Sequence, residues 1–352
     1  MLTVDQVGEL VRPALAPSVR VTGAAELGGG GFAAVWKVLL DDGSAVVLKT
    51  SPPPDAELLG YERGLLAVEA DYFARIAREL PDLPVPEVLH HGTDRSRCDG
   101  DWMVMSLLPG TPLSELSAGP RDAGVRRQLG AALARVHALE GPEFGYPGEG
   151  RRRAATWRAA YLGIVDDLLA DADRLGWTLP VPATEIARTV AAAADALEPV
   201  TRPALVHFDL WDGNVLAAPD ASGAGSGSAA GTGTGAGVGS AAGALRLSGL
   251  VDGERCLYGD PLVDLVSPVL FGAIEDEPDH PLLRGYASAT GGKPLDHAEV
   301  ARIRLYRLWL YLVMNVEIPT RGMDAPAHAA GNTHRAELLR AAVAAVAAVR
   351  KG

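Results

Sequence analysis

The feature that most constrains this chain is a polar loop that follows directly on an apolar run, in residues 205–214, LVHFDLWDGN. The acid of the loop, Asp209, is followed five positions later by an amide, Asn214. A carboxylate that can accept a proton would thus lie beside a neutral oxygen of the kind that Mg²⁺ binds. A fold that uses this pair must bring a cation and a second carboxylate to it. Without those partners the block is only a polar turn.

The composition is that of a globular protein with room for two lobes. The chain has 352 residues, of which 48% are hydrophobic, and a formal net charge of −12 at pH 7. This net negative charge argues against a nucleic-acid binder, which would normally carry a basic face. The two cysteines, Cys98 and Cys256, are too few for a disulfide framework. We expect a monomer or homodimer with no nucleic-acid partner.

The sequence has neither a signal-peptide pattern nor a membrane-spanning run. The first ten residues, MLTVDQVGEL, carry acids where a signal peptide has bases. No segment reaches roughly 18 consecutive apolar residues. We therefore expect a cytoplasmic protein that does not bind a membrane.

The N-terminal part predicts a small antiparallel sheet. A glycine-rich stretch, residues 27–32, leads into a strand over 33–40, and a turn joins this strand to a return strand over 45–49. These residues predict three antiparallel strands, with the glycine loop between the first two. Prolines mark a break before a further strand over 101–105. A short helix is expected near residues 3–15.

Lys49 closes the return strand, and a helix with an apolar stripe is expected over residues 57–80. Glu69 falls on that stripe, where a carboxylate is costly to bury unless a cation meets it. A lysine on a neighbouring strand supplies the cation, so we expect Lys49 and Glu69 to form a pair. Glu62, on a similar face of the helix, is the alternative partner.

The rest of the chain is predicted to be mostly helical. Helices are expected from about residue 125, over 154–175 and 183–197, along 303–317, and in an alanine-rich stretch over 335–349.

Residues 221–244 interrupt this pattern, because all but Val238 are Ala, Gly, Ser or Thr. Such a tract has too little apolar surface to offset the entropy of ordering, which predicts a flexible linker. Its flanks, residues 215–216 and 245–251, read as two arms of one hairpin. Because the cost of closing a loop grows only slowly with its length, the tract is interpreted as an insertion within a domain.

Asp252 follows the second arm of this hairpin and is the candidate for the second carboxylate. It lies 38 positions after Asn214, and removal of the 24-residue tract leaves 14, the length of an ordinary hairpin. With the glycine loop, Lys49 and Glu69, this order of features predicts a phosphoryl-transfer site. In this interpretation the glycine backbone approaches the phosphates, and Asp209 takes the proton of an acceptor hydroxyl.

At these positions the chain resembles the aminoglycoside phosphotransferase family, with its fructosamine-kinase and choline-kinase relatives. The block 259–265, GDPLVDL, matches a sequence that commonly follows the metal aspartate in that family. The matching stretches lie at 28–32, 47–50, around Glu69, and at 102–110, 133–139, 205–214 and 251–265, between about residues 20 and 320.

The resemblance implies an α+β, two-lobed protein-kinase-like fold with ATP or GTP in the cleft. Residues 1–105 would form the N-lobe, 106–110 the connector and 111–352 the helical C-lobe, which holds the insertion at 219–244.

The resemblance also implies roles for individual residues. Asp209 would be catalytic, Asn214 and Asp252 would bind Mg²⁺, and Asp264 would brace the catalytic loop. The nucleotide-binding residues would be Gly28, Gly29, Gly30, Gly31, Phe32, Lys49, Glu69, Met105, Ser106 and Leu108.

Departures from the family pattern supply candidates for substrate contact. Phe208 stands where the family usually has glycine before the catalytic acid, and Glu254 is an added carboxylate after Asp252. Trp211 is either a stacking platform for a sugar ring or a residue packed under the loop. The full set of candidates is Phe208, Trp211, Asp212, Glu254 and Glu317.

We therefore expect a kinase that moves the γ-phosphate of ATP or GTP to a hydroxyl of a sugar-containing small molecule. The main hypothesis is an antibiotic of the aminoglycoside or nucleoside type, with a role in resistance. The alternatives are a metabolic kinase for fructosamines, free sugars or choline-like alcohols, and a non-catalytic kinase-like binding protein.

Overall fold

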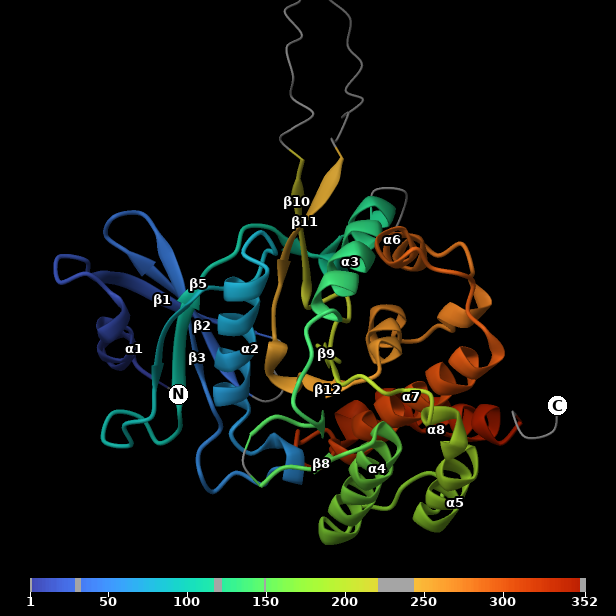
Figure 1. Cartoon of the computed structure of the whole chain (residues 1–352). Coiled ribbons are helices and arrows are strands. Elements are labelled where there is room, and N and C mark those ends of the chain that lie inside the picture. Colours follow the sequence, from blue (N-terminus) through green and yellow to red (C-terminus); the bar gives the residue numbers. More distant parts are fainter. Residues whose placement is uncertain (1, 29–32, 117–121, 149, 221–243, 349–352) are drawn as a thin grey trace, which may run out of the picture.

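A computed structural model describes residues 2–28, 33–116, 122–148, 150–220 and 244–348 of the chain. An antiparallel sheet forms the N-terminal part, and most of the remaining residues are helical (Figure 1). The tract 221–243, which includes most of the predicted linker, and Gly29–Phe32 of the glycine loop lie outside the described residues. In the described part of the chain, no helix combines the length and the apolar character needed to cross a membrane.

The N-terminal sheet has five strands in the order β1-β2-β3-β5-β4, and every neighbouring pair is antiparallel. Its strands are β1 (Val21–Leu27), β2 (Ala34–Leu40), β3 (Ala45–Thr50), β4 (Val88–Gly92) and β5 (Trp102–Ser106). The predicted hairpin of β2 and β3 is confirmed. The strand predicted before the glycine loop is also confirmed: it is β1, which pairs with β2 in antiparallel orientation.

Each face of this sheet is covered by one helix. Helix α1 (Val4–Val11) packs with Trp36, Leu48 and Trp102 in a small apolar cluster, and the Trp102 indole donates to the Leu10 carbonyl at 3.0 Å. Helix α2 (Leu65–Glu79) covers the opposite face. Side chains alternate along a strand, so Lys49, one position after Leu48, faces α2.

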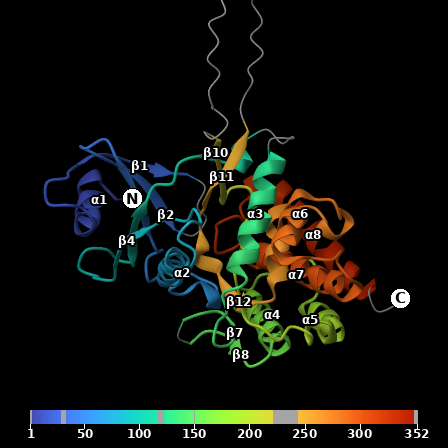
Figure 2. The same cartoon turned by 45° about the horizontal axis from the view of Figure 1, so that its top comes forward.

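The expected helix over 57–80 begins later than predicted. A 3₁₀ turn at Gly60–Glu62 comes first, and α2 starts only after Gly64, whose φ of 67° is left-handed. Glycine adopts this conformation without steric penalty, and here it separates the turn from the helix. Both views place α2 between the sheet and the helical part (Figures 1 and 2).

The helical part is built on six helices among the described residues. They are α3 (Asp122–Val136), α4 (Trp157–Arg174), α5 (Ala183–Ala193), α6 (Pro281–Thr290), α7 (His297–Val316) and α8 (Ala329–Ala348). The predicted helices are all present, with ends shifted by a few residues; α8 begins six residues before its expected start.

Helix α7 is the centre of the main core. Its Trp309 and Tyr306 pack against Trp157 and Tyr161 of α4, with ring centroids 5.8 to 6.4 Å apart. The Trp157 indole donates to the Tyr306 hydroxyl at 2.7 Å, and the Tyr161 hydroxyl donates to the Leu305 carbonyl at 2.6 Å. Buried aromatic side chains whose polar atoms are also bonded fix α4 and α7 relative to each other.

Two short sheets carry the loops of the candidate site. One has the order β11-β10-β6, and the other has the order β8-β7-β12-β9. Their strands are β6 (Thr111–Pro112), β7 (Phe144–Gly145), β8 (Arg153–Ala154), β9 (Ala204–Val206), β10 (Val215–Pro219), β11 (Leu245–Leu250) and β12 (Leu257–Gly259). Strands β10 and β11 pair from Val215↔Leu250 to Pro219↔Leu245, so the predicted hairpin around the tract is confirmed.

Candidate active site

Lys49 is the buried cation of the site and contacts three carboxylates. Its Nζ lies 2.8 Å from Oε2 of Glu69 and 2.9 Å from Oδ1 of Asp252, and it also pairs with Glu254. The side chain is only 3% exposed. The predicted contact with Glu69 is therefore formed. Glu62, the alternative partner, pairs instead with Arg321, because the turn before α2 directs it toward the helical part.

Burial and charge act against each other in this cluster. Burial opposes the charge on Lys49, but the neighbouring carboxylates raise its pKa well above the ordinary value. For Glu69, burial raises the pKa to about 8 against the opposing effect of Lys49. Apart from Lys49, neither oxygen of Glu69 has a partner among the described residues. Three acids thus share one cation, which leaves an excess of negative charge.

Asp252 is the member of this cluster that is partly exposed to solvent. It follows β11 in a left-handed conformation, with φ of 60°, and its side chain is 41% exposed. Although burial opposes ionisation, the Lys49 ammonium holds the pKa of Asp252 below its ordinary value. The next residue is Gly253, where a Cβ would come within 2.5 Å of the Tyr72 ring of α2. A glycine is needed here so that α2 can pack against the segment that carries Asp252 and Glu254.

The loop of Asp209 is fixed by a second buried carboxylate. Asp264 accepts hydrogen bonds from the backbone N–H groups of His207 at 2.9 Å and of Phe208 at 2.6 Å, and it contacts the His137 ring at 3.0 Å. The Leu210 N–H donates to the Ser267 hydroxyl at 2.9 Å. These bonds satisfy the backbone of a loop that has no strand partner there. The bracing role of Asp264 stays a prediction.

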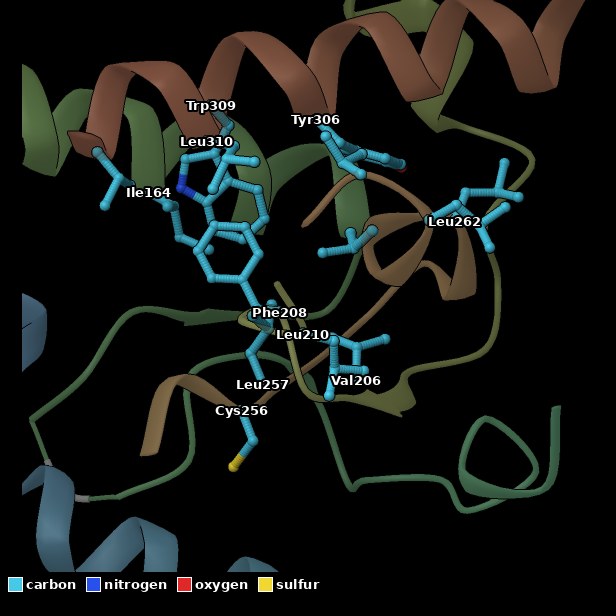
Figure 3. Packing of buried hydrophobic residues seen from close by; sticks show 14 of the residues in the cluster. Ile164, Val206, Phe208, Leu210, Cys256, Leu257, Leu262, Tyr306, Trp309 and Leu310 are labelled. Carbon is cyan, nitrogen blue, oxygen red and sulfur yellow. The ribbon is translucent and has the colours of Figure 1, made fainter. Parts of the chain in front are cut away.

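Phe208 occupies a strained position, and its ring lies in the core. Its φ is 71°, and the ring stacks on Trp309 with centroids 4.2 Å apart and planes at 17° (Figure 3). Only 2% of the residue is exposed. A ring buried in this way does not support the expected role of Phe208 as a candidate for substrate contact. The left-handed backbone turns the side chain into the helical core and not toward the cleft.

Asp209 keeps an accessible carboxylate beside a cation. Its side chain is 26% exposed, and Oδ2 lies 3.5 Å from Nε of Arg255. Burial raises the pKa of Asp209 to about 6, against the opposing effect of Arg255, while Glu254 and Asp252 add to the rise. A carboxyl group with such a pKa is ionised at neutral pH and is still a better proton acceptor than an ordinary aspartate.

Asn214 is oriented by the loop itself. Its amide nitrogen donates to the Asp209 carbonyl at 2.8 Å, and its own carbonyl accepts from the Val251 N–H at 3.1 Å. The amide oxygen is thus the side-chain atom that can bind a cation. The backbone contact also links the loop of Asp209 to the residue that precedes Asp252.

The substrate candidates lie in different surroundings. Trp211 is 38% exposed and covers Gly213, where a Cβ would come within 2.2 Å of the indole. Asp212 pairs with Arg126 of α3 at 2.8 Å. Glu254 is held by Lys49, and Glu317, at the end of α7, pairs with Arg255 at 2.8 Å and with the Tyr61 hydroxyl.

Two of the nucleotide-binding candidates lie at the end of the N-terminal sheet. Met105 and Ser106 belong to β5, and the Ser106 N–H donates to the Glu87 carbonyl at 2.9 Å. Leu108 packs near Gly249 of β11. Of the glycine loop, the structure describes Gly28, in a turn after β1. The roles of these residues in nucleotide binding stay predictions.

Arg255 and Tyr61 were not singled out from the sequence. Arg255 lies between Asp209 and Glu317, and its guanidinium carbon is 5.8 Å from the centre of the Tyr61 ring. Tyr61 and Glu317 are 256 positions apart in the sequence, so only the fold brings them together. One feature of the sequence could have indicated a role for Arg255: it is a cation that comes directly after the two acids Asp252 and Glu254.

A series of contacts ties the turn before α2 to the helical part. The Gly60 N–H donates to Asp171 at 2.8 Å, and the Leu58 carbonyl accepts from Arg174 at 2.8 Å. The other contacts are Tyr61 with Glu317, Glu62 with Arg321, and the Arg63 carbonyl with Arg151. We call residues 58–63 the interlobe segment.

The donor set fits a divalent cation. Glu69, Asp252 and Glu254 offer oxygens that all lie within 4.8 Å of one another, and these three acids all contact the single ammonium of Lys49. Mg²⁺ prefers a few protein oxygens together with phosphate oxygens and water. The partly exposed carboxylate of Asp252 and the amide oxygen of Asn214 are suited to such a site.

Comparison with known proteins identifies related sequences. A family model described as "Phosphotransferase enzyme family" matches residues 24–225. A "Probable ketoamine kinase" from Klebsiella aerogenes is 28% identical over 172 residues, which are 45% of this chain and 55% of that protein. A second "Probable ketoamine kinase", from Escherichia coli strain K12, is 28% identical over 176 residues with the same coverage. The chain thus spans about half the length of the curated relatives it matches.

Solved structures share the fold over nearly the whole chain. A putative fructosamine-3-kinase from Thermobifida fusca has a TM-score of 0.60 and 24% identity, over 97% of this chain and 99% of that one. A macrolide 2'-phosphotransferase from Brachybacterium faecium has a TM-score of 0.56 and 19% identity, over 95% of this chain and 98% of that one. An aminoglycoside phosphotransferase, APH(4)-Ia, in complex with AMP-PNP and hygromycin B, has a TM-score of 0.56 and 17% identity, over 99% of both chains. The predicted α+β kinase-like fold is confirmed.

Proposed function

The chain belongs to the phosphotransferase enzyme family, and from this premise we propose that it is a kinase that transfers the γ-phosphate of ATP to a hydroxyl of a ketoamine. A ketoamine is a sugar joined through an amine to a second group. We infer the substrate class from the similarity of the chain to two proteins named as probable ketoamine kinases. The contacts of Lys49, Asp209 and Asp252 support the chemistry.

In this proposal Lys49 holds the phosphates of the nucleotide. Glu69 has no described partner other than Lys49, so it acts to keep the ammonium of Lys49 at the end of β3. A negatively charged nucleotide would replace the contacts of Lys49 with Asp252 and Glu254. Phosphoryl transfer needs this kind of fixed positive charge more than it needs covalent chemistry.

Asp209 is proposed to orient the acceptor hydroxyl and to take its proton. Its side chain is 26% exposed, and Arg255 contacts the carboxylate at 3.5 Å. A base of this kind contributes roughly 10²- to 10⁴-fold to the rate.

Asn214 and Asp252 are proposed to hold Mg²⁺, which when bound would neutralise charge on the phosphates. The excess of negative charge around Lys49 supports this assignment. Asn214 is already oriented by its bond to the Asp209 backbone, so its amide oxygen needs little rearrangement.

The ketoamine hypothesis replaces an antibiotic as the first choice. The macrolide and aminoglycoside phosphotransferases share the fold with this chain at 17% to 19% identity, and a likeness at that level extends to the fold alone. Trp211, with 38% of the residue exposed two positions after Asp209, offers a face on which a sugar ring could stack.

The test is a panel of acceptors assayed for ADP release. The panel contains fructosamines of free amino acids, free fructose, choline, an aminoglycoside and a macrolide, with Asp209→Asn as the inactive control. We expect turnover that depends on Mg²⁺ and is highest with a fructosamine. Turnover with an antibiotic and none with any ketoamine would overturn the proposed substrate class.

A further inference from the structure

The carboxylate of Asp209 has one charged neighbour that can restrain its direction. Its Oδ2 lies 3.5 Å from Nε of Arg255, and among the described residues the carboxylate makes no other ion pair and accepts no hydrogen bond. An aspartate side chain has two rotatable torsions, so a carboxylate without a partner samples several directions. In the described part of the chain, Arg255 is therefore the group that restrains the proposed base.

Arg255 is itself held by two other side chains. Its Nη2 lies 2.8 Å from Oε1 of Glu317, and its guanidinium carbon lies 5.8 Å from the centre of the Tyr61 ring. Only 15% of the Arg255 side chain is exposed. A guanidinium that pairs with a carboxylate and also lies over an aromatic ring is restrained by both contacts. It thus contacts Asp209 from a fixed place.

Glu317 is committed to contacts within the protein. The Tyr61 hydroxyl donates to its Oε1, which is the same oxygen that faces Arg255, and Arg321 lies 3.7 Å from it. The Glu317 side chain is only 10% exposed. A substrate that bound Glu317 would have to displace these groups. The contacts therefore favour a role in holding Arg255 over the contact with substrate that was expected for Glu317.

We propose that Arg255 is a positioning residue, which holds the carboxylate of Asp209 in the direction of the acceptor hydroxyl. Glu317 and the hydroxyl of Tyr61 keep Arg255 in place. The inference rests on the proposed function and adds to it three residues that need not touch a substrate. Their effect is on the rate, because a displacement of roughly 1 Å in a catalytic group costs about 10²-fold.

The first experiment measures kcat and KM of Arg255→Met with a fructosamine as the acceptor. Each protein is assayed at the pH where its turnover has reached a plateau, so that the ionisation of Asp209 does not enter the comparison. We expect kcat to fall roughly tenfold to hundredfold, and KM for ATP and for the acceptor to stay within about threefold. A change in KM that exceeds the change in kcat would mean that Arg255 binds a substrate, and would overturn the inference.

The same substitution in the Asp209→Asn protein shows whether Arg255 acts through the base. That protein has no carboxylate to position, so Arg255→Met should change its residual kcat less than about threefold. A further loss of about tenfold in this background would mean that Arg255 acts on the reaction directly or through the fold, and would refute its positioning role.

The hydroxyl of Tyr61 has a matched control in Tyr146. The two rings stack with centroids 5.5 Å apart, and the Tyr146 hydroxyl makes no hydrogen bond within the described part of the chain. Tyr61→Phe keeps the ring but removes the bond to Glu317, so kcat should fall roughly threefold to tenfold. Tyr146→Phe should stay within about twofold of the wild type. Equal effects of the two substitutions would contradict the inference, even if Arg255→Met did not fold.

Crystal structures separate this inference from the proposed function, because they need no turnover. In the full chain with Arg255→Met, the Asp209 side chain should occupy more than one rotamer or leave its wild-type direction, and in Tyr146→Phe it should keep that direction. If no acceptor is phosphorylated but Asp209 is displaced in the arginine variant alone, the kinase assignment fails and the positioning by Arg255 stands. If a fructosamine is phosphorylated and Asp209 keeps its direction in Arg255→Met, the kinase assignment stands and the inference is refuted.

Discussion

The carboxylate of Asp209 faces the guanidinium of Arg255, with 3.5 Å between Oδ2 and Nε. The same guanidinium bonds to Glu317 at 2.8 Å, so one cation serves two acids. The pairing favours the ionised form of Asp209, against the effect of burial and of the neighbouring acids. The charge on Arg255 therefore contributes to keeping the proposed base ready at neutral pH.

The dependence of kcat/KM on pH should reflect the opposing effects of burial and of Arg255 on the pKa of Asp209. Asp209 acts as a base only when ionised, and its pKa is raised to about 6, so kcat/KM should fall as the pH is lowered through about 6. Arg255→Met removes a group that lowers this pKa, so the acidic limb should move to higher pH. The measurement is kcat/KM between pH 5 and 9 for both proteins. An acidic limb that moves to lower pH in the variant would contradict the assigned role of Arg255.

Asp209→Asn tests the base itself. The amide has nearly the shape of the carboxylate but accepts no proton, so turnover should fall roughly 10²- to 10⁴-fold while the nucleotide still binds. ADP release gives turnover, and titration with a fluorescent ATP analogue gives binding. Retention of turnover within about tenfold of the wild type would exclude Asp209 as the base.

Lys49→Met should destabilise the fold as well as impair use of the nucleotide. Removal of the ammonium leaves the acids of this largely buried cluster without the cation they share, which should lower the free energy of unfolding by about 3–5 kcal/mol. Adding Glu254→Gln to that variant removes one of the like charges and should restore part of the loss. Urea unfolding at pH 7 measures both effects. Additive losses in the double variant would show that the charges do not interact.

Arg321→Met tests the interlobe segment. The Glu62 carboxylate is fully buried, and Arg321 is the cation that pairs with it. Its removal should lower the free energy of unfolding by about 3 kcal/mol. Arg284→Met is the matched control, since its side chain is 56% exposed and its ion pair lies in solvent. The control should stay within about 0.5 kcal/mol of wild type in urea unfolding, and equal effects of the two variants would argue against a structural role for the buried pair.

The left-handed backbone of Phe208 predicts an unusual order of stability. Phe208→Ala should lower the free energy of unfolding by about 3–5 kcal/mol through loss of the contact with Trp309. Phe208→Gly loses the same contact but relieves the backbone strain, so it should be about 1 kcal/mol more stable than the alanine variant. Thermal and urea unfolding of the two variants decide the order. A less stable glycine variant would mean that the strain is negligible.

The sequence allowed the local elements of the site to be predicted because their signals are local. The alternation of apolar residues before Lys49 and the helical stripe that contains Glu69 each depend on neighbouring residues, and both side chains meet as expected. The arms of the β10–β11 hairpin could be matched for the same reason, once the tract of small residues was set aside.

Contacts between distant segments could not be predicted in this way. Nothing around Tyr61 indicates that its hydroxyl reaches Glu317, because that contact depends on how the turn before α2 meets the end of α7. The position of Phe208 was misjudged for a related reason. Its side chain follows a left-handed backbone, whose N–H groups at His207 and Phe208 donate hydrogen bonds to Asp264, 56 positions after Phe208 in the sequence.

The interlobe segment has a mechanical consequence for α2. It bonds to α4, to the end of α7 and to Arg321, and it leads directly through Gly64 into the helix that carries Glu69. A swing of α2 away from Lys49 would have to break these bonds together, and Gly253 packs against the same helix farther along. The helix is thus anchored as part of the larger, helical body. In the proposed kinase, a helix anchored in this way holds Glu69 at Lys49 without any activating movement of α2.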